Sequence, residues 1–277
     1  MKAINCKGNL LCLDEPVVMG IINVTPDSFY EGHIALQADG ILSLAEEMIK
    51  DGAAILDIGG MSTKPGSRPV SIQEEIDRLL PVITSINKTF PDAIISVDTY
   101  RSHVAKVAVE AGAAIVNDIS GGMMDNEMIH TVAALKVPYI CMHMKGTPEN
   151  MQLNPVYENV VTEVLDFLIE RTNTCKVAGI LDVILDPGFG FGKTIEHNFQ
   201  LLKNLHAFSI TGMPVLAGLS RKSSIYKTLG CGPADALNGT TVLNTIALMN
   251  GANILRVHDV KQAKEAVLLF NTYKKAP

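Results

Sequence analysis

The chain carries little charge, and it has no excess of basic residues, with 23 Lys and Arg against 29 Asp and Glu. Charged residues make up 19% of its 277 residues, and the formal net charge is −6. Proteins that bind nucleic acid or an anionic membrane usually present an excess of Lys and Arg. The composition therefore argues against both kinds of partner. Any basic cluster is expected to serve a local anion.

Paired cysteines and long apolar runs are also missing. No apolar run approaches the roughly 20 residues of a membrane span, and polar residues interrupt the apolar ones near the start, unlike a secretory signal peptide. The cysteines are odd in number and include no C-x-x-C pair, which favours reduced thiols over disulfides or a zinc site. We therefore expect a soluble cytoplasmic protein. The five cysteines are Cys6, Cys12, Cys141, Cys175 and Cys231.

The chain is instead rich in short apolar runs that alternate with helical periods. The runs read as apolar throughout rather than at every second position, as in strands buried on both faces. Between them, apolar residues recur at helical spacing, and Ser71 and Glu74 have the spacing of a helix capping box. The eight runs occupy residues 17–22, 55–58, 94–97, 115–116, 139–142, 183–185, 215–217 and 254–257.

Eight strands alternating with helices predict an α/β fold of the (β/α)₈ TIM-barrel class, which needs about 250 residues. We expect one domain over residues 1–277. Residues 1–15 are expected to form a short N-terminal hairpin, with strands at 3–6 and 10–13 joined through Gly8 and Asn9. Two long loops, at 24–38 and 59–70, are predicted to be mobile loops over the active site.

In a barrel of this class the active site lies at the carboxyl ends of the strands. Nearly all residues that directly follow the eight runs are polar, and several are ionisable. One barrel mouth would bring them together. They are Asn23, Gly59 to Thr63, Asp98, Asn117 and Asp118, His143, Asp186, Ser220 to Lys222, Arg256 and His258.

The most informative stretch is LDVILDPGFGFGK, at residues 181–193. A proline ends the strand and leaves Asp186 at its carboxyl tip. Three glycines and two phenylalanines follow, which predicts a floor for a flat, polar-edged ligand. The stretch matches neither the P-loop nor the dinucleotide glycine pattern, because Pro187 and Lys193 occupy positions where those patterns need glycine.

These residues carry a resemblance to a known family. The segments MGIINVTPDSF, DIGGMSTKPGSRPVS, SVDT, VNDISGG, CMHM, DPGFGFGK, GLSRKS and RVHDV occur in the order and spacing of the dihydropteroate synthases. The resemblance implies condensation of a dihydropterin pyrophosphate ester with p-aminobenzoate to give dihydropteroate and pyrophosphate. It also implies Mg²⁺ as cofactor and a homodimer.

The resemblance assigns roles to individual residues. The catalytic set would be Asp98, Asn117, Asp186, Lys222, Arg256 and His258. Pterin binding would use Asp98, Asn117, Met142, Asp186, Phe191, Lys222 and Arg256. The pyrophosphate would lie against Asn23, Arg256 and His258, with Asn23 also the Mg²⁺ contact. The p-aminobenzoate site and its lid would include Phe29, Glu31, Thr63, Lys64, Pro65, Ser220 and Arg221.

Several of these assignments also follow from chemistry. A carboxylate such as Asp186 suits the adjacent amino group and ring N–H of a pterin, because it accepts two hydrogen bonds side by side. Arg221 could steer the carboxylate of the second substrate. His143 is interpreted as structural or as a support for neighbouring residues rather than as a metal ligand.

The chain departs from the family pattern in two loops. Lys64 occupies a position where the family usually has arginine, and the two side chains differ in bidentate geometry. The first loop reads DSFYEGH, so that Glu31 keeps a negative charge on a longer side chain.

Three other interpretations remain open at this point. A related barrel that transfers a methyl group from a folate would share Asp98, Asn117 and Asp186, but would have no use for Arg256 and His258 as an anion site. A pterin-binding barrel without catalysis is the second. A different barrel enzyme acting on a phosphorylated substrate is the third.

Replacing Asp186 with Asn tests the predicted ligand floor. We expect Asp186→Asn to abolish pterin binding and to leave the fold intact, because the amide cannot accept both hydrogen bonds from the pterin edge. Isothermal calorimetry measures the binding. Pterin binding within a few-fold of the parent chain would show that Asp186 does not hold the pterin.

Overall fold

The computed structural model describes residues 2–24, 34–61 and 70–277. Five residues with predicted roles in the lid lie outside the described residues, namely Phe29, Glu31, Thr63, Lys64 and Pro65. Most of the two loops predicted to be mobile lies outside them as well.

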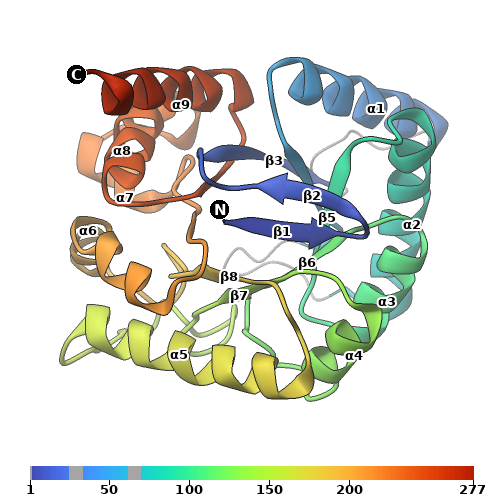
Figure 1. Cartoon of the computed structure of the whole chain (residues 1–277), viewed down its shortest axis with the longest axis horizontal. Helices are drawn as coiled ribbons and strands as arrows, with labels where there is room; N and C mark the ends of the chain where they lie inside the picture. Colours follow the sequence, from blue (N-terminus) through green and yellow to red (C-terminus); the bar gives the residue numbers. More distant parts are fainter. Residues whose placement is uncertain (1, 25–33, 62–69) are drawn as a thin grey trace.

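A barrel of parallel strands forms the centre of the described part of the chain (Figure 1). Neighbouring strands follow chain order from β3 to β10, and β10 pairs with β3. A bridge between Leu185 and Val215 joins β8 to β9. The predicted α/β TIM barrel is confirmed. The strands are β3 (Val17–Asn23), β4 (Ile55–Gly59), β5 (Ile94–Asp98), β6 (Ile115–Asp118), β7 (Tyr139–Met142), β8 (Val183–Asp186), β9 (Leu216–Ala217) and β10 (Ile254–Val257).

Helices surround the strands on the outside (Figure 1). Ser71 caps α2 as predicted, because its hydroxyl accepts a hydrogen bond from the Glu74 amide. Among the described helices, none is both long and apolar enough to cross a membrane. The helices are α1 (Ile34–Lys50), α2 (Ile72–Thr89), α3 (Ser102–Glu110), α4 (Met128–Leu135), α5 (Val160–Ala178), α6 (Ile195–Lys203), α7 (Ser223–Leu229), α8 (Leu237–Met249) and α9 (Val260–Lys275), with short 3-10 helices η2 (Leu205–Thr211) and η3 (Pro233–Asp235).

Two predicted boundaries were wrong. The hairpin strands are β1 (Ala3–Cys6) and β2 (Asn9–Cys12), so the turn lies at Lys7 and Gly8, one residue earlier than predicted. Both turn residues have positive φ, which a two-residue hairpin turn of this hand requires. The loop predicted at 24–38 is also shorter, because α1 begins at Ile34.

The barrel interior has an apolar layer at its amino-terminal end. This layer packs against Ile4, Cys6 and Leu13 of the hairpin segment, which covers that end of the barrel. The layer comprises Met19, Ile55, Ile94, Ile115, Ile140, Ile184, Leu216 and Ile254.

A second interior layer lies two residues further along each strand. Because side chains two residues apart in a strand point to the same face, this layer lies directly above the apolar one. Its members are mostly polar and lie nearer the carboxyl ends. They are Ile21, Asp57, Ser96, Asn117, Met142, Asp186, Gly218 and Arg256.

The hairpin's contribution to stability can be measured with a matched pair of leucines. Leu13 is fully buried in the apolar layer, whereas Leu10 is 75% exposed. We expect Leu13→Ala to lower the free energy of unfolding by about 2–5 kcal/mol through lost burial and a residual cavity. Leu10→Ala should change it by less than about 0.5 kcal/mol. Urea denaturation measures both, and equal effects would contradict the packing of Leu13 under the barrel.

Candidate active site

Four neighbouring strands end in one row of residues at the barrel mouth. Asn23 pairs with Gly59, Gly59 with Asp98, and Asp98 with Asn117. Asn23 is exposed, Asp98 is half-buried and Asn117 is buried, so the row descends from solvent into the barrel. Gly59 leaves space between the side chains of Asn23 and Asp98, because a Cβ at this position would contact both.

The guanidinium of Arg256 is held between two carboxylates. Its Nε lies 2.6 Å from Oδ2 of Asp57, and one Nη lies 2.5 Å from Oδ2 of Asp98. The amide of Asn117 donates to the same Asp57 oxygen at 3.1 Å. Burial opposes the charge of Arg256, but the two carboxylates prevail and raise its pKa above the usual range. Arg256 therefore stays positively charged inside the barrel.

Burial also disfavours the charged form of Asp98, and here burial prevails. It raises the pKa of this carboxyl to about 7, although the charge of Arg256 acts to lower it. Asp98 thus titrates close to neutral pH. Asp98 does not cap the following helix α3, because Arg101 occupies the N-cap position of that helix.

Sequence reasoning missed Asp57, because the run at 55–58 was read as apolar throughout. The structure buries its side chain completely and bonds it to Arg256 and Asn117. A carboxylate in the middle of an otherwise apolar strand was the available signal, since an ionised group in such a place needs a charged partner.

Asp186 and Lys222 form the opposite side of the mouth. Asp186 Oδ1 accepts a hydrogen bond from the Gly188 amide at 2.8 Å, and burial raises the pKa of this carboxyl. The ammonium of Lys222 donates to the Phe189 carbonyl and lies 4.9 Å from the centre of the Phe191 ring. Burial lowers the pKa of Lys222 to about 8, with Asp186 opposing the shift. Lys222 is therefore still mostly charged at neutral pH.

The glycine-rich loop after β8 has a backbone that only glycine accommodates well. Gly188, Gly190 and Gly192 all have positive φ. A Cβ at Gly188 would overlap the carbonyl oxygen of His143. The loop therefore packs directly on the backbone that follows β7.

His143 lies beneath this loop, buried and away from the mouth. Its Nδ1 lies 2.9 Å from the ammonium of Lys193. This agrees with the interpretation that His143 supports its neighbours rather than binding a metal. Sequence reasoning considered Lys193 only in the failed P-loop and dinucleotide matches, and no local signal showed that its side chain turns inward.

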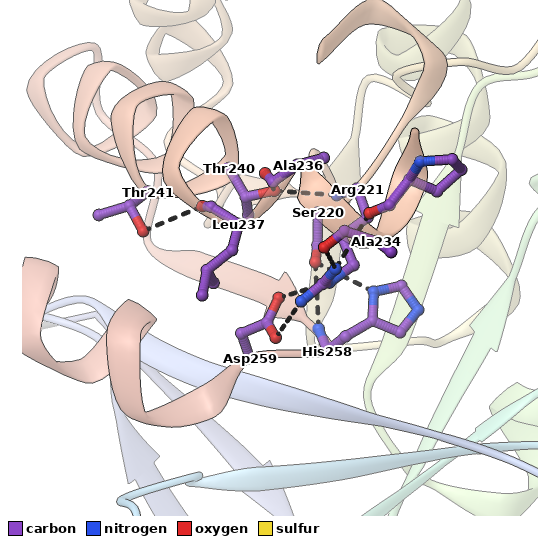
Figure 2. Close-up of polar contacts among 10 residues, drawn as sticks. Ser220, Arg221, Ala234, Ala236, Leu237, Thr240, Thr241, His258 and Asp259 are labelled. Atoms are coloured by element: carbon purple, nitrogen blue, oxygen red, sulfur yellow. Dashed lines mark hydrogen bonds and ion pairs between the residues drawn. The ribbon is translucent and has the colours of Figure 1, made fainter. Parts of the chain in front are cut away.

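The residues that follow β9 and β10 are joined by a polar network, shown in Figure 2. The Ser220 hydroxyl lies 3.0 Å from Nδ1 of His258 and accepts a hydrogen bond from the His258 amide. The Arg221 guanidinium forms two hydrogen bonds with the carboxylate of Asp259, at 2.8 and 2.9 Å. It also donates to the carbonyls of Pro233 and Ala234.

This network corrects the role expected for Arg221. Four of its five N–H donors are used within the chain, so the guanidinium is not positioned to steer a substrate carboxylate. Asp259 raises the pKa of Arg221 and keeps the pair charged. Ser220 instead orients the exposed ring of His258.

The structure thus brings the described candidates to one mouth, on neighbouring strands. Carboxylates, an amide and two cations lie there together with the apolar side chains of Met142 and Phe191. Such a set can bind the polar edge of a flat heterocycle and an adjoining anion. The candidates are Asn23, Asp98, Asn117, Met142, Asp186, Phe191, Ser220, Lys222, Arg256 and His258.

Comparison with known proteins agrees with this chemistry. The model of the family described as "Pterin binding enzyme" matches residues 19–258. The dihydropteroate synthase of Haemophilus influenzae is 44% identical over 266 residues, covering 95% of this chain and 96% of the relative.

Solved structures agree as well. The dihydropteroate synthase of Yersinia pestis in a sulfonamide drug complex has a TM-score of 0.93 and 40% identity, and the match covers 99% of this chain and 100% of that one. The Xanthomonas albilineans enzyme in complex with 7,8-dihydropteroate has a TM-score of 0.90 and 38% identity, with 100% of both chains covered. The chain therefore belongs to the pterin-binding enzyme family, among the dihydropteroate synthases.

Proposed function

We propose that this chain condenses 6-hydroxymethyl-7,8-dihydropterin pyrophosphate with p-aminobenzoate, giving 7,8-dihydropteroate and pyrophosphate in folate biosynthesis. The observation that carries the proposal is the group of polar side chains at the barrel mouth, in which Asn117, Asp186 and Arg256 belong to the polar layer and Asp98 bonds Arg256 from above it. The similarity to an enzyme solved with 7,8-dihydropteroate supports it.

The pterin ring lies in this layer. Asp186 accepts from the 2-amino group and the adjacent ring N–H, since its second oxygen is not the one bound to Gly188. At the opposite ring edge, Asn117 donates a hydrogen bond and Asp98 accepts one. Lys222 donates to the ring oxygen, and Arg256 lies along the ring face, where a planar guanidinium stacks well. Met142 and Phe191 form the apolar walls.

The pyrophosphate lies at the exposed end of the site, against Asn23, Arg256 and His258. Mg²⁺ binding here would use the Asn23 amide oxygen together with oxygens of the substrate phosphates. The described residues hold no cluster of three acidic, His or Cys groups that could enclose a metal ion. This fits Mg²⁺, which keeps several waters and often takes only one or two protein ligands. The ion would supply charge neutralisation for the leaving group.

The reaction proceeds by loss of pyrophosphate followed by attack of the amine. The pterin ring delocalises the positive charge left on its exocyclic carbon, so the chain supplies no nucleophile. Arg256 and His258 stabilise the departing anion, and the buried carboxylates Asp98 and Asp186 stabilise the cationic ring. The segments at 24–33 and 59–70, predicted to act as lids, would exclude water from the cation, and p-aminobenzoate would enter beside them near Ser220.

We also propose that the chain works as a cytoplasmic homodimer. Helices α8 and α9 expose apolar side chains around a hollow of about 440 Å³. An exposed apolar patch of this kind is typical of protein interfaces. Met249, Leu269 and Tyr273 line this hollow and are exposed, and Val242 and Leu268 are exposed apolar residues of the same two helices.

Pyrophosphate release tests the proposed reaction. The chain is supplied with the dihydropterin pyrophosphate ester and Mg²⁺, with and without p-aminobenzoate. We expect release that depends on the amine, with dihydropteroate as product. Pterin binding without release would contradict the proposal and favour a methyl-transferring or non-catalytic pterin-binding barrel.

The pKa of Asp98 predicts how pterin binding depends on pH. Asp98 is protonated below its raised pKa of about 7, and the ionised form is the stronger acceptor for the ring N–H. The affinity for 6-hydroxymethyl-7,8-dihydropterin should therefore rise with pH, by at most about 30-fold between pH 5.5 and pH 8. This ligand has no phosphate that would titrate in the same range. Calorimetry measures the affinity, and Asp98→Asn should remove the dependence. An unchanged pH profile in that variant would assign the titration to another group.

The proposed dimer surface can be tested with two exposed leucines. Leu269 lies on α9 and is 72% exposed, whereas Leu181 is 94% exposed and lies between α5 and β8. A charge buried in an apolar interface is costly, so Leu269→Glu should weaken the dimer by at least tenfold and Leu181→Glu should not. Analytical ultracentrifugation measures both. A monomeric parent chain would refute the dimer.

A further inference from the structure

The side chain of Lys193 is directed into the protein beneath the glycine-rich loop. It is only 3% exposed. Its ammonium lies 2.9 Å from the Gly188 carbonyl oxygen, 3.0 Å from that of Phe191 and 3.3 Å from that of His143. The fourth neighbour is Nδ1 of His143, at 2.9 Å. Three backbone oxygens and one ring nitrogen thus surround a single cationic group.

This arrangement determines how the glycine-rich loop is held. Each backbone carbonyl from Gly188 to Gly192 accepts a hydrogen bond from a side chain. Lys193 serves Gly188 and Phe191, and the other three carbonyls are bonded to Lys222, Gln152 and Tyr157 respectively. Side chains, rather than a neighbouring strand, therefore bind the carbonyls of the loop and fix its shape. Lys193 is the only one of these side chains that binds two of the loop's carbonyls.

The surroundings of Nζ indicate the protonation of the pair. Three carbonyl oxygens, which can only accept, call for three N–H donors, and only the ammonium form of Lys193 has three. Since an ammonium has no acceptor, Nδ1 of His143 then accepts and the ring proton lies on Nε2. Burial and the charge of Lys193 lower the pKa of His143 to about 2, which keeps the ring neutral. Burial lowers the pKa of Lys193 well below its usual range, and the nearby Asp186 carboxylate opposes that shift. The Lys222 ammonium acts in the same direction as burial.

Two residues of the loop belong to the proposed pterin site or orient it, namely Phe191 and Gly188. Gly188 donates its amide to Asp186, and Gly188 is also bonded to Lys193. Phe191 forms one wall of the site, and its carbonyl is bonded to Lys193. One ammonium therefore connects the residue that orients the carboxylate with the residue that carries the aromatic ring.

We propose that Lys193 is a positioning residue whose ammonium acts as a built-in cation, fixing the glycine-rich loop so that Asp186 and Phe191 face the pterin. The inference rests on the proposed function only in identifying the ligand of this loop as a pterin. Lys193 touches neither substrate. Without its ammonium, two carbonyls of the loop and one of the β7 segment lose a buried charged donor, which favours a rearranged loop.

The first experiment replaces Lys193 with Met, which keeps the apolar stem and removes the donors. We expect the KM for the dihydropterin pyrophosphate to rise at least tenfold and the KM for p-aminobenzoate to stay within twofold. The matched control is Lys203→Met, because Lys203 is exposed at the end of α6. The control should retain parent values. A folded Lys193→Met chain with the parent pterin KM would overturn the proposal, as would equal changes in both KM values.

Chemical rescue separates the ammonium from general packing. In Lys193→Ala, n-propylammonium matches the missing side-chain atoms, three carbons and one nitrogen. It should restore pterin affinity at least fivefold, whereas n-propanol, a neutral alcohol of the same size, should not. Equal rescue by the neutral alcohol would overturn the role of the charge. If Lys193→Met does not fold, the pterin KM is measured in Lys193→Gln instead, because Gln keeps an N–H donor but carries no charge. A folded Gln variant with the parent pterin KM would also overturn the proposal.

The outcome is distinguishable from failure of the proposed function. If the parent chain neither binds the dihydropterin nor releases pyrophosphate, the function is wrong. If the parent chain does both and the Lys193 variants match it, only the positioning role is wrong.

Discussion

The site depends on one buried arginine. Removing a guanidinium from water is costly, and the cost is offset only when carboxylates and further hydrogen bonds surround it. Asp57 and Asp98 supply the charges, from neighbouring strands β4 and β5. Asn117 on the next strand then fixes Asp57. The charged centre consequently ties together four of the strands that form the mouth.

The two-residue repeat of the barrel strands places this charged group above an apolar layer. The lower interior layer is apolar and is closed by the hairpin segment, whereas the layer above it is polar. A ligand bound in the upper layer thus contacts fixed dipoles and charges, with the apolar layer beneath it. Such preorganised groups stabilise developing charge without having to reorganise during the reaction. The glycine-rich loop adds a second rigid side, because side chains bind each of its carbonyls.

Much of this could be predicted from the sequence. The alternation of apolar runs and helical periods was enough for the barrel, and the residues after each run included nearly all the polar groups now seen at the mouth. Asp57 was missed because a strand buried on both faces looks uniformly apolar when its two faces are not separated. Lys193 was missed because its partners, His143 and the loop carbonyls, come together only in the folded chain. The role of Arg221 was wrong for the same reason, since Asp259 lies 38 residues away in sequence.

The central claim is that the pterin site is already formed before the ligand binds. A crystal structure of the chain with 6-hydroxymethyl-7,8-dihydropterin tests it most directly. The ring should lie between Arg256 and the side chains of Met142 and Phe191, with both Asp186 oxygens engaged. The backbone from Asp186 to Lys193 should move by less than about 1 Å. A ring bound elsewhere, or a rebuilt glycine-rich loop, would contradict the account.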